Sequence, residues 1–145
     1  VIEADYRDTS FTKWKLDTKT ADTKYASCRV SYVEPATGAC IEYTAYTEDY
    51  DEDAKTNQQL ELYAKVGSVA EAKTMAEKHL RLHNKFSKTV QFTHTGHVWY
   101  VAGVGIRVKG YGFWDGRYIC TQAKHTINEN GYTTVVTGRR ILEGY

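Results

Sequence analysis

The sequence predicts an α+β fold that is mostly β, with antiparallel barrel-like sheets and one main helix packed against them. Apolar and polar residues alternate with a period of two along most of the chain, as in half-buried strands. One stretch, at about 69–83, instead shows the spacing of a helix. Twelve Tyr and three Trp beside a single Pro also favour strands, because aromatic side chains fit a pleated surface.

Four stretches before the helix are expected to be extended. They are FTKWKL (11–16), YASCRVSYV (25–33), ACIEYTAY (39–46) and LELYAKV (60–66). The turn residues of EPATG (34–38) join the second and third stretches, so these two are predicted to form an antiparallel hairpin. Residues 47–59, TEDYDEDAKTNQQ, are acidic and polar without periodicity, which indicates a solvated loop.

The helix has a recognisable start and stop. Ser68 stands three residues before Glu71, which is the spacing of a capping box. Asn84 is expected to end the helix. The residues that recur at helical spacing and predict its packed face are Val69, Ala72, Ala76, His79 or Leu80, and His83.

Five strands are predicted after the helix, at 89–94, 97–102, 105–111, 116–127 and 133–142. Glycine-containing pairs separate them. Asp115-Gly116 and Asn130-Gly131 are the strongest hairpin signals, because a type I′ turn needs positive φ at both central residues. We therefore expect GYGFWDGRY and INENGYTT to be corners of an antiparallel meander and not reactive loops.

The order of the elements predicts a β lobe at about 1–59 and a second lobe, the helix plus a barrel-like sheet, at about 60–145. A chain of 145 residues is long enough to bury a core. It begins without Met, within what reads as a strand, so we expect residues 1–145 to be one fragment of a longer polypeptide.

Charge and cysteine content exclude several classes of protein. Nineteen basic and eighteen acidic residues leave a net charge of +1, which gives no field to attract nucleic acid or anionic lipid. No apolar run is long enough to cross a membrane. The odd number of cysteines, Cys28, Cys40 and Cys120, predicts reduced thiols, with a Cys28–Cys40 bridge across the predicted hairpin as the alternative.

The histidines do not predict a metal site. His79 and His83 share a helix face, but the glutamate of the HExxH metalloprotease signature is missing. His94 and His97 flank a turn without a cysteine or carboxylate nearby in the sequence. No metal and no cofactor are expected.

The acidic run at 49–53 copies the first acidic positions of a calcium-binding loop. Ala54 occupies the position of the essential glycine, and Leu60 occupies that of the bidentate glutamate. The motif fails where calcium geometry is most demanding, so a solvated acidic loop is predicted.

No nucleophile with a suitable base is found. Cys120 and His125 are five residues apart on one predicted strand, where they would face opposite sides unless a bulge intervened. GVGIRVKG (103–110) lacks the Gly-Lys-Ser/Thr ending of a phosphate-binding loop. We predict that the chain is not an enzyme.

Aromatic residues are concentrated in the second half of the chain. They are Trp99, Tyr100, Tyr111, Phe113, Trp114, Tyr118 and Tyr132. Aromatics that alternate along strands usually belong to a core, whereas an exposed row of them could stack on sugars. The sugar-stacking alternative predicts a glycan-binding module.

A series of short motifs runs through residues 60–145. Its members are Ser68, Glu71, Gly96, Gly103, Asp115, Gly116, Tyr118, His125, Gly131 and Tyr132. In order and spacing this series resembles the phage late control protein D family of tail proteins, which includes baseplate hub proteins of prophage-like elements. Trp114, directly before Asp115, departs from the family pattern, and residues 1–59 match it only in style.

The resemblance implies a structural role with no catalytic residues. Proteins of this family form trimeric hubs that join the tail tube to the central spike, in the tail of a virion or phage-like particle assembled in the bacterial cytoplasm. Other copies of the chain, the tube and the spike or baseplate would be the partners. His125 and Tyr132 would be fold determinants, with the Tyr132 hydroxyl bonded at the rim. The alternative is a cell-wall glycan-binding module of a tail-associated lytic protein.

Overall fold

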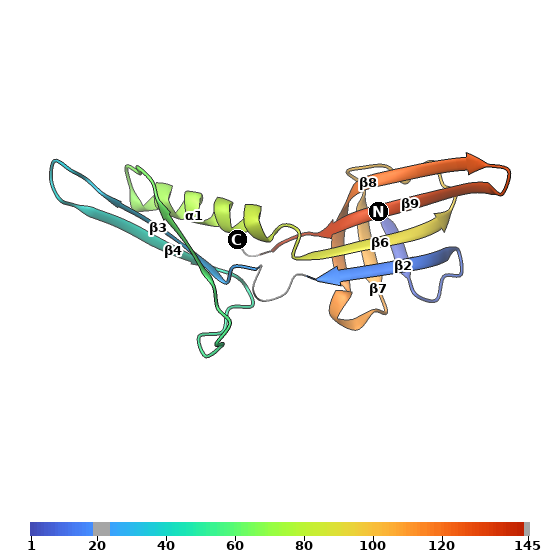
Figure 1. The fold of residues 1–145 in the computed structure, drawn as a ribbon, viewed down its shortest axis with the longest axis horizontal. Helices are drawn as coiled ribbons and strands as arrows, with labels where there is room; N and C mark the ends of the chain where they lie inside the picture. Colours follow the sequence, from blue (N-terminus) through green and yellow to red (C-terminus); the bar gives the residue numbers. More distant parts are fainter. Residues whose placement is uncertain (19–23, 144–145) are drawn as a thin grey trace. The chain divides into compact units, whose positions relative to one another are not determined.

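The computed structural model describes residues 1–18 and 24–143, and it is mostly β with one α-helix in this part of the chain (Figure 1). It divides into two compact units. Residues 1–18 combine with 86–141 in the first, and the described part of 19–85 combines with Leu142 and Glu143 in the second. The predicted lobe boundary near residue 59 therefore differs from the division seen here, because strand pairing joins the N-terminal residues to the second half of the chain.

The first unit is a curled six-stranded sheet, here called the six-stranded unit. Its strands are β1 (Ile2–Asp5), β2 (Phe11–Thr18), β6 (Lys88–Thr95), β7 (Gly105–Lys109), β8 (Gly116–Asn128) and β9 (Gly131–Arg140). The order is β1-β7-β8-β9-β6-β2, with β1 parallel to β7 and every other pair antiparallel. Consecutive strands β1 and β2 thus occupy opposite edges, and no ladder joins them among the described residues, so the barrel stays open.

One face of this sheet is buried. Its core residues are Ile2, Ala4, Phe11, Val90, Phe92, Ile106, Val108, Tyr118, Cys120 and Val136. They alternate along their strands, which confirms the period-two prediction. Burial of each large side chain contributes about 1.5–3 kcal/mol relative to exposure, so this face supplies most of the stability of the unit.

The predicted strand at 97–102 is wrong. Residues 96–104 form an irregular connection between β6 and β7, in which Val98, Trp99 and Val101 are exposed. The alternating apolar residues imitate a strand, but no neighbouring strand pairs with them. The connection instead closes on β8, where the N–H of Gly103 donates to the Cys120 carbonyl over 2.8 Å.

Both glycine-marked corners are present, but neither is a type I′ turn at the marked pair. Between β8 and β9, Asn128 is paired with Gly131, so Glu129 and Asn130 make the turn. Gly131 has φ of 115°, whereas no described residue other than glycine has positive φ. The β7–β8 corner is longer and contains the short 3-10 helix η2 (Gly112–Trp114).

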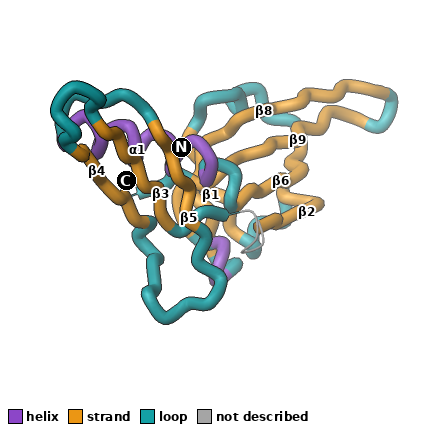
Figure 2. Tube along the Cα trace, turned by 60° about the vertical axis from the view of Figure 1, so that its left-hand side comes forward, coloured by secondary structure: helices purple, strands orange, loops and turns teal. Residues whose placement is uncertain are grey.

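The second unit is a three-stranded sheet covered on one face by the helix, here called the three-stranded unit (Figure 2). Its elements are β3 (Ser27–Val33), β4 (Cys40–Tyr46), β5 (Gln59–Tyr63) and α1 (Val69–Asn84). The predicted β3–β4 hairpin is confirmed, while β3 and β5 are parallel. The core residues between helix and sheet are Cys28, Val30, Ala45, Val66, Ala72, Ala76 and Leu80.

The helix begins as predicted and packs through Ala72, Ala76 and Leu80 of the predicted stripe, joined by Asn84. Val69 and His83, also predicted for this stripe, are exposed. Two alanines in this stripe let the backbone approach the sheet closely.

At the helix N-terminus, the Ser68 hydroxyl accepts from the N–H of Glu71 over 3.2 Å. The Glu71 carboxylate accepts from the N–H of Gly67 over 2.7 Å, one residue earlier than in a standard capping box.

Asn84 joins the end of the helix to the residues that precede β3. Its side chain is fully buried. Its Nδ2 donates to the Tyr25 carbonyl over 2.7 Å, and its Oδ1 accepts from the Tyr25 N–H over 3.0 Å. One amide therefore satisfies both backbone groups of Tyr25, as a neighbouring strand would.

The other face of the three-stranded sheet is open and carries charged side chains beside the exposed Val33, Tyr46 and Tyr63. Arg29 lies between two carboxylates, 2.7 Å from Glu42 and 3.9 Å from Glu61. The hydrogen bond from Arg29, helped by its charge, lowers the pKa of Glu42, although some desolvation opposes it.

The cysteines are free thiols, and the Cys28–Cys40 bridge is wrong. Cys28 is opposite Ala45 and buried under the helix, whereas Cys40 is opposite Val33 and exposed. Residues 28 and 33 are five apart on one strand, so the two cysteines lie on different faces of the hairpin.

Asn84→Ala should lower the free energy of unfolding by about 2–4 kcal/mol, because both backbone groups of Tyr25 lose their partner. Urea unfolding measures this loss. Lys78→Ala, on the exposed face of the same helix, is the control and should change the free energy by less than about 0.5 kcal/mol. A loss no larger than that of the control would refute the role of Asn84.

Glu42→Gln should destabilise the chain at neutral pH and have no effect in acid. Because the folded pKa of Glu42 is lowered, its pair with Arg29 stabilises the fold above the unfolded pKa of about 4.3. That stabilisation disappears as the pH falls through the folded pKa. Urea unfolding of both proteins between pH 7 and pH 2.5 tests this, with the exposed Glu129→Gln as control. A difference that is constant with pH would contradict it.

Candidate functional site

The structure distributes the predicted motif residues over three places. Ser68 and Glu71 cap the helix of the three-stranded unit. Asp115, Gly116 and Tyr118 form the β7–β8 corner of the six-stranded unit. A third group lies around the β6–β7 connection and the β8–β9 hairpin; its members are Gly96, Gly103, His125, Gly131 and Tyr132.

His125 and Tyr132 are brought together and hold the β6–β7 connection. Nε2 of His125 donates to the Tyr100 carbonyl over 3.0 Å, and a carbonyl can only accept, so this nitrogen carries the proton. In the neutral ring Nδ1 then accepts, and the hydroxyls of Tyr132 and Thr134 lie 2.8 and 3.1 Å away. We call His125, Tyr132, Thr134 and Tyr100 the histidine clamp. The Tyr132 hydroxyl is expected to form a hydrogen bond at the rim, and in the structure its partner is His125.

Gly96 completes the clamp because it leaves room for an aromatic ring. Its N–H donates to the Tyr132 carbonyl over 2.7 Å. A Cβ atom on Gly96 would overlap the Tyr132 ring atoms Cδ1 and Cγ. Only glycine therefore allows the connection to lie against this ring without displacing it.

The clamp positions a set of exposed apolar side chains. Val98, Trp99 and Val101 are 65%, 75% and 48% exposed, and they flank the Tyr100 carbonyl that His125 binds. Ile127 is 80% exposed and opposite Tyr132 in the β8–β9 ladder, on the same face as His125. We call these four residues the exposed apolar set. Fixed apolar side chains of this kind suit contact with another protein.

Behind the clamp, aromatic and imidazole rings pack together. His97 stacks on Tyr100 with centroids 4.6 Å apart, and His94 lies between Tyr100 and Phe11 at 5.0 and 4.7 Å. His94 and His97 thus belong to a ring cluster. No group of three potential metal ligands is found among residues 1–18 and 24–143. Burial, and the charge of Asp8, raise the pKa of Tyr100.

The β7–β8 corner is a second polar cluster. The side-chain carboxylate of Asp115 accepts a hydrogen bond from the Tyr111 N–H over 2.6 Å. The backbone carbonyl of Asp115 accepts one from the Arg140 guanidinium over 3.0 Å. Gly116 has φ of 144°, which favours glycine. The fully buried Tyr118 donates its hydroxyl proton to the Trp114 carbonyl over 2.7 Å, so the backbone of Trp114 is part of the corner. Burial raises the pKa of Tyr118, and Arg140 offsets this only in part.

Cys120 and His125 face the same side, because the bulge that the prediction named as the exception is present. A bulge between Cys120 and Gln122 shifts the side-chain alternation by one residue. They still do not form a nucleophile–base pair. The Cys120 thiol donates to the Gln122 carbonyl over 3.4 Å, burial raises its pKa, and His125 is engaged in the clamp.

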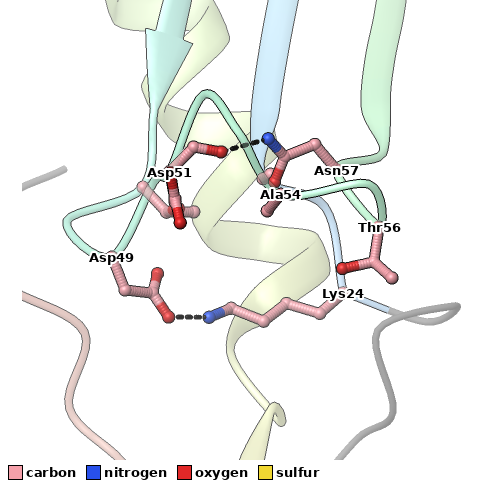
Figure 3. A pocket seen from close by; sticks show the side chains of 8 residues that line it. Lys24, Asp49, Asp51, Ala54, Thr56 and Asn57 are labelled. Carbon is pink, nitrogen blue, oxygen red and sulfur yellow. Dashed lines mark hydrogen bonds and ion pairs between the residues drawn. The ribbon is translucent and has the colours of Figure 1, made fainter.

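A small pocket lies beside the acidic loop of the three-stranded unit (Figure 3). Lys24 pairs with Asp49 across it, and the Asp51 carbonyl accepts from the Asn57 amide. The Asp51 carboxylate accepts from the Asp53 N–H over 3.1 Å. Partial burial raises the pKa of Asp49, but the Lys24 hydrogen bond and charge outweigh it, so that pKa is lowered. These contacts hold the loop through its own side chains and backbone. They do not bring together the six to eight oxygen ligands that calcium takes.

The exposed aromatic residues do not form a row along any one described strand. They are Tyr6, Tyr46, Tyr63, Phe86, Trp99 and Phe113. No two of them stand at a spacing of two on a strand, and only Tyr46 and Tyr63 share a described sheet face, that of the three-stranded sheet. In the described part of the chain, no helix is both long and apolar enough to cross a membrane.

The chain is similar to known proteins in structure but not in sequence. No family model matches the sequence, and no curated protein matches it. The tail protein from Neisseria meningitidis MC58 matches 97% of this chain with a TM-score of 0.71 at 12% identity. The 43 kDa tail protein of prophage MuSo2 from Shewanella oneidensis matches 96% with a TM-score of 0.70, also at 12% identity.

A third solved structure supports the same conclusion. The prophage tail protein gp18 from Listeria monocytogenes EGD-e matches 99% of this chain with a TM-score of 0.54 at 11% identity. This chain covers 44%, 42% and 42% of the three structures, which is less than half of each. The chain therefore has a phage tail protein fold, in agreement with the broader part of the family resemblance.

Gly96→Ala should lower the free energy of unfolding by about 1–3 kcal/mol, because the new methyl group must displace the Tyr132 ring from the clamp. In a Tyr132→Ala background the same substitution should cost less than about 0.5 kcal/mol. Urea unfolding of the four proteins gives the coupling energy.

Gly105→Ala is the matched control for this cycle, since its Cβ would meet only Val1 at an ordinary 3.7 Å. It should change the free energy by less than about 0.5 kcal/mol. Equal costs of Gly96→Ala with and without the Tyr132 ring would rule out the steric explanation.

Proposed function

We propose that this chain is part of a structural protein in the baseplate hub of a phage or phage-like tail, of the late control protein D type. In this role it joins the tail tube to the central spike by protein–protein contacts. The observation that carries the proposal is the likeness to two tail proteins over 97% and 96% of the chain. The motif series from Ser68 to Tyr132 adds the narrower assignment to a hub.

The polar side chains of the motif series form hydrogen bonds within the chain that stabilise the fold. His125 binds a backbone carbonyl and two hydroxyls, and Asp115 closes a corner. The exposed side chains next to the clamp are apolar. A fixed apolar surface with its polar groups engaged in the scaffold suits an assembly module.

The partners in this proposal are two further copies of the parent protein, the tail tube and the spike or baseplate. The location is the tail of the particle, after assembly in the bacterial cytoplasm. The exposed apolar set is the surface we assign to one of these contacts, because its side chains are presented by a backbone that the clamp fixes.

The proposal predicts a trimer of the longest natural polypeptide that contains this chain. Light scattering after size exclusion, at about 10 µM and above, should give three times the chain mass. Trp99→Ser/Val101→Ser should reduce its incorporation into tail particles, measured by immunoblotting of purified particles, whereas Tyr63→Ser should not. A monomeric parent that is absent from particles, and that binds purified cell-wall glycan, would overturn the hub proposal.

A further inference from the structure

The two units carry opposite charge. The residues of the six-stranded unit include ten Lys and Arg against six Asp and Glu, a formal charge of +4. The residues assigned to the other unit include nine basic and twelve acidic side chains, a formal charge of −3. The net charge of +1 for the whole chain conceals this asymmetry.

The basic residues of the six-stranded unit gather on the outer face of its sheet. Core residues Ile106, Tyr118 and Val136 point inward, so their strand neighbours point outward. We call this outer surface the basic face; its basic side chains are Lys13, Lys15, Arg107, Lys109, Arg117, Lys124 and Arg139, and they outnumber the carboxylates of Glu3, Asp5 and Asp17 on the same face. Six of these seven basic residues are exposed, and Arg139 is half-buried.

Stability of the sheet does not explain the basic face. Arg107 is directly opposite Arg117 in the β7–β8 ladder, where like charges are destabilising, although Glu3 is opposite Arg107 in the β1–β7 ladder and offsets part of this. Lys15 pairs with Asp17. Within the described residues, no side-chain hydrogen bond or ion pair engages Arg107, Lys124 or Arg139. Because basic side chains outnumber carboxylates on this face, it gains by meeting negative charge from elsewhere.

The surface chemistry favours a protein over nucleic acid. No outward-facing residue of these six strands is aromatic, so the face offers no ring on which bases could stack. Between the basic side chains lie polar residues such as Gln91, Thr93 and Thr137. A pleated polar face of this kind can meet another protein surface of opposite charge.

The same chain carries such a surface. The loop between β4 and β5 contains five acidic residues within six positions, Glu48, Asp49, Asp51, Glu52 and Asp53. Only Asp49 has an ion-pair partner among the described residues, Lys24. The loop is braced by the Lys24–Asp49 and Asp51–Asn57 contacts drawn in Figure 3 and by the bond from the Asp53 N–H to the Asp51 carboxylate, so the carboxylates of Asp49 and Asp51 are held in place before any partner arrives.

We propose that the basic face of one copy docks the acidic loop, residues 48–53, of a second copy. Charge complementarity between two different surfaces of one chain produces a head-to-tail contact, which closes into a ring or extends as a filament. The inference rests on the proposed tail role for its biological setting, while its physical support is the charge distribution alone. It adds to that role the surfaces through which copies meet.

Charge-reversal variants of this chain test the contact. Arg107→Glu/Lys124→Glu alters the basic face, and Glu52→Lys/Asp53→Lys alters the acidic loop. Lys73→Glu/Lys78→Glu on the exposed side of α1 is the control, since it changes the net charge by the same amount as the basic-face variant. Sedimentation velocity between about 5 and 500 µM, in 50 and 500 mM salt, measures self-association.

The wild-type chain and the α1 control should associate at 50 mM salt and dissociate at 500 mM, where screening is strong. The basic-face variant Arg107→Glu/Lys124→Glu and the acidic-loop variant Glu52→Lys/Asp53→Lys should each weaken association at least tenfold. An equimolar mixture of these two variants should associate again, because the unaltered acidic loop of the first can dock on the unaltered basic face of the second. Recovery in the mixture also shows that both variants are folded.

Three results would overturn the inference. One is a wild-type chain that stays monomeric at 50 mM salt up to 500 µM. Another is a mixture that does not recover association. A wild-type chain that compacts at low salt without concentration dependence, which indicates a contact within one chain, counts as the first result. The third is binding of a DNA duplex that Arg107→Glu/Lys124→Glu abolishes, without self-association, which assigns the face to nucleic acid. A trimeric parent found in particles would still support the tail role in all three cases.

Discussion

The ladder between β2 and β6 is the interaction on which the rest of the structure depends. It pairs Phe11 with His94 and continues to Thr18 and Lys88, and it joins residues that are about seventy to eighty positions apart. The rings of Phe11, Trp14 and Phe92 pack across it at centroid distances of 5.0–5.3 Å. Closing so long a loop costs only slightly more entropy than closing a short one, so a well-packed ladder can hold it. The three-stranded unit is consequently an insertion between two neighbouring strands of the six-stranded sheet.

Each unit adds one polar clamp to its apolar core. In the three-stranded unit Asn84 satisfies both backbone groups of Tyr25, and in the six-stranded unit His125 binds the Tyr100 carbonyl. Both clamps lie where a backbone segment leaves the strand ladders and would otherwise lack partners. The apolar core supplies most of the free energy of folding, whereas the clamps decide which backbone geometry is kept, because an unsatisfied buried group costs about 1–3 kcal/mol.

The surfaces that remain are suited to assembly. An exposed apolar set lies beside the histidine clamp, and the outer sheet face and the acidic loop have opposite charge. Reactive side chains are few, and those that first suggest chemistry, Cys120 and Asp49, are held in local contacts. The role proposed above needs rigid surfaces that recognise neighbours, and this division between scaffold and surface would suit it.

The sequence by itself determined the local elements. Alternation with a period of two predicts β2, β3, β4, β8 and β9, and the Ser68–Glu71 spacing with Asn84 predicts both ends of α1. The motif series through His125 and Tyr132 resembles a family of tail proteins, and the fold that the chain shares with tail proteins agrees with it. These signals are carried by neighbours in the chain, whose side-chain directions follow from backbone geometry alone.

Only the tertiary structure decided which elements meet. Alternation shows that a strand has a buried face but not which strand lies beside it, so the parallel pairing of β1 with β7 and the division into units were not predictable. The apolar residues at 97–102 alternate as in a strand, but the sequence does not show that no neighbouring strand pairs with them. The bulge after Cys120 reverses the expected faces for a similar reason, since register is set by the neighbouring strand and not by the residues that it shifts.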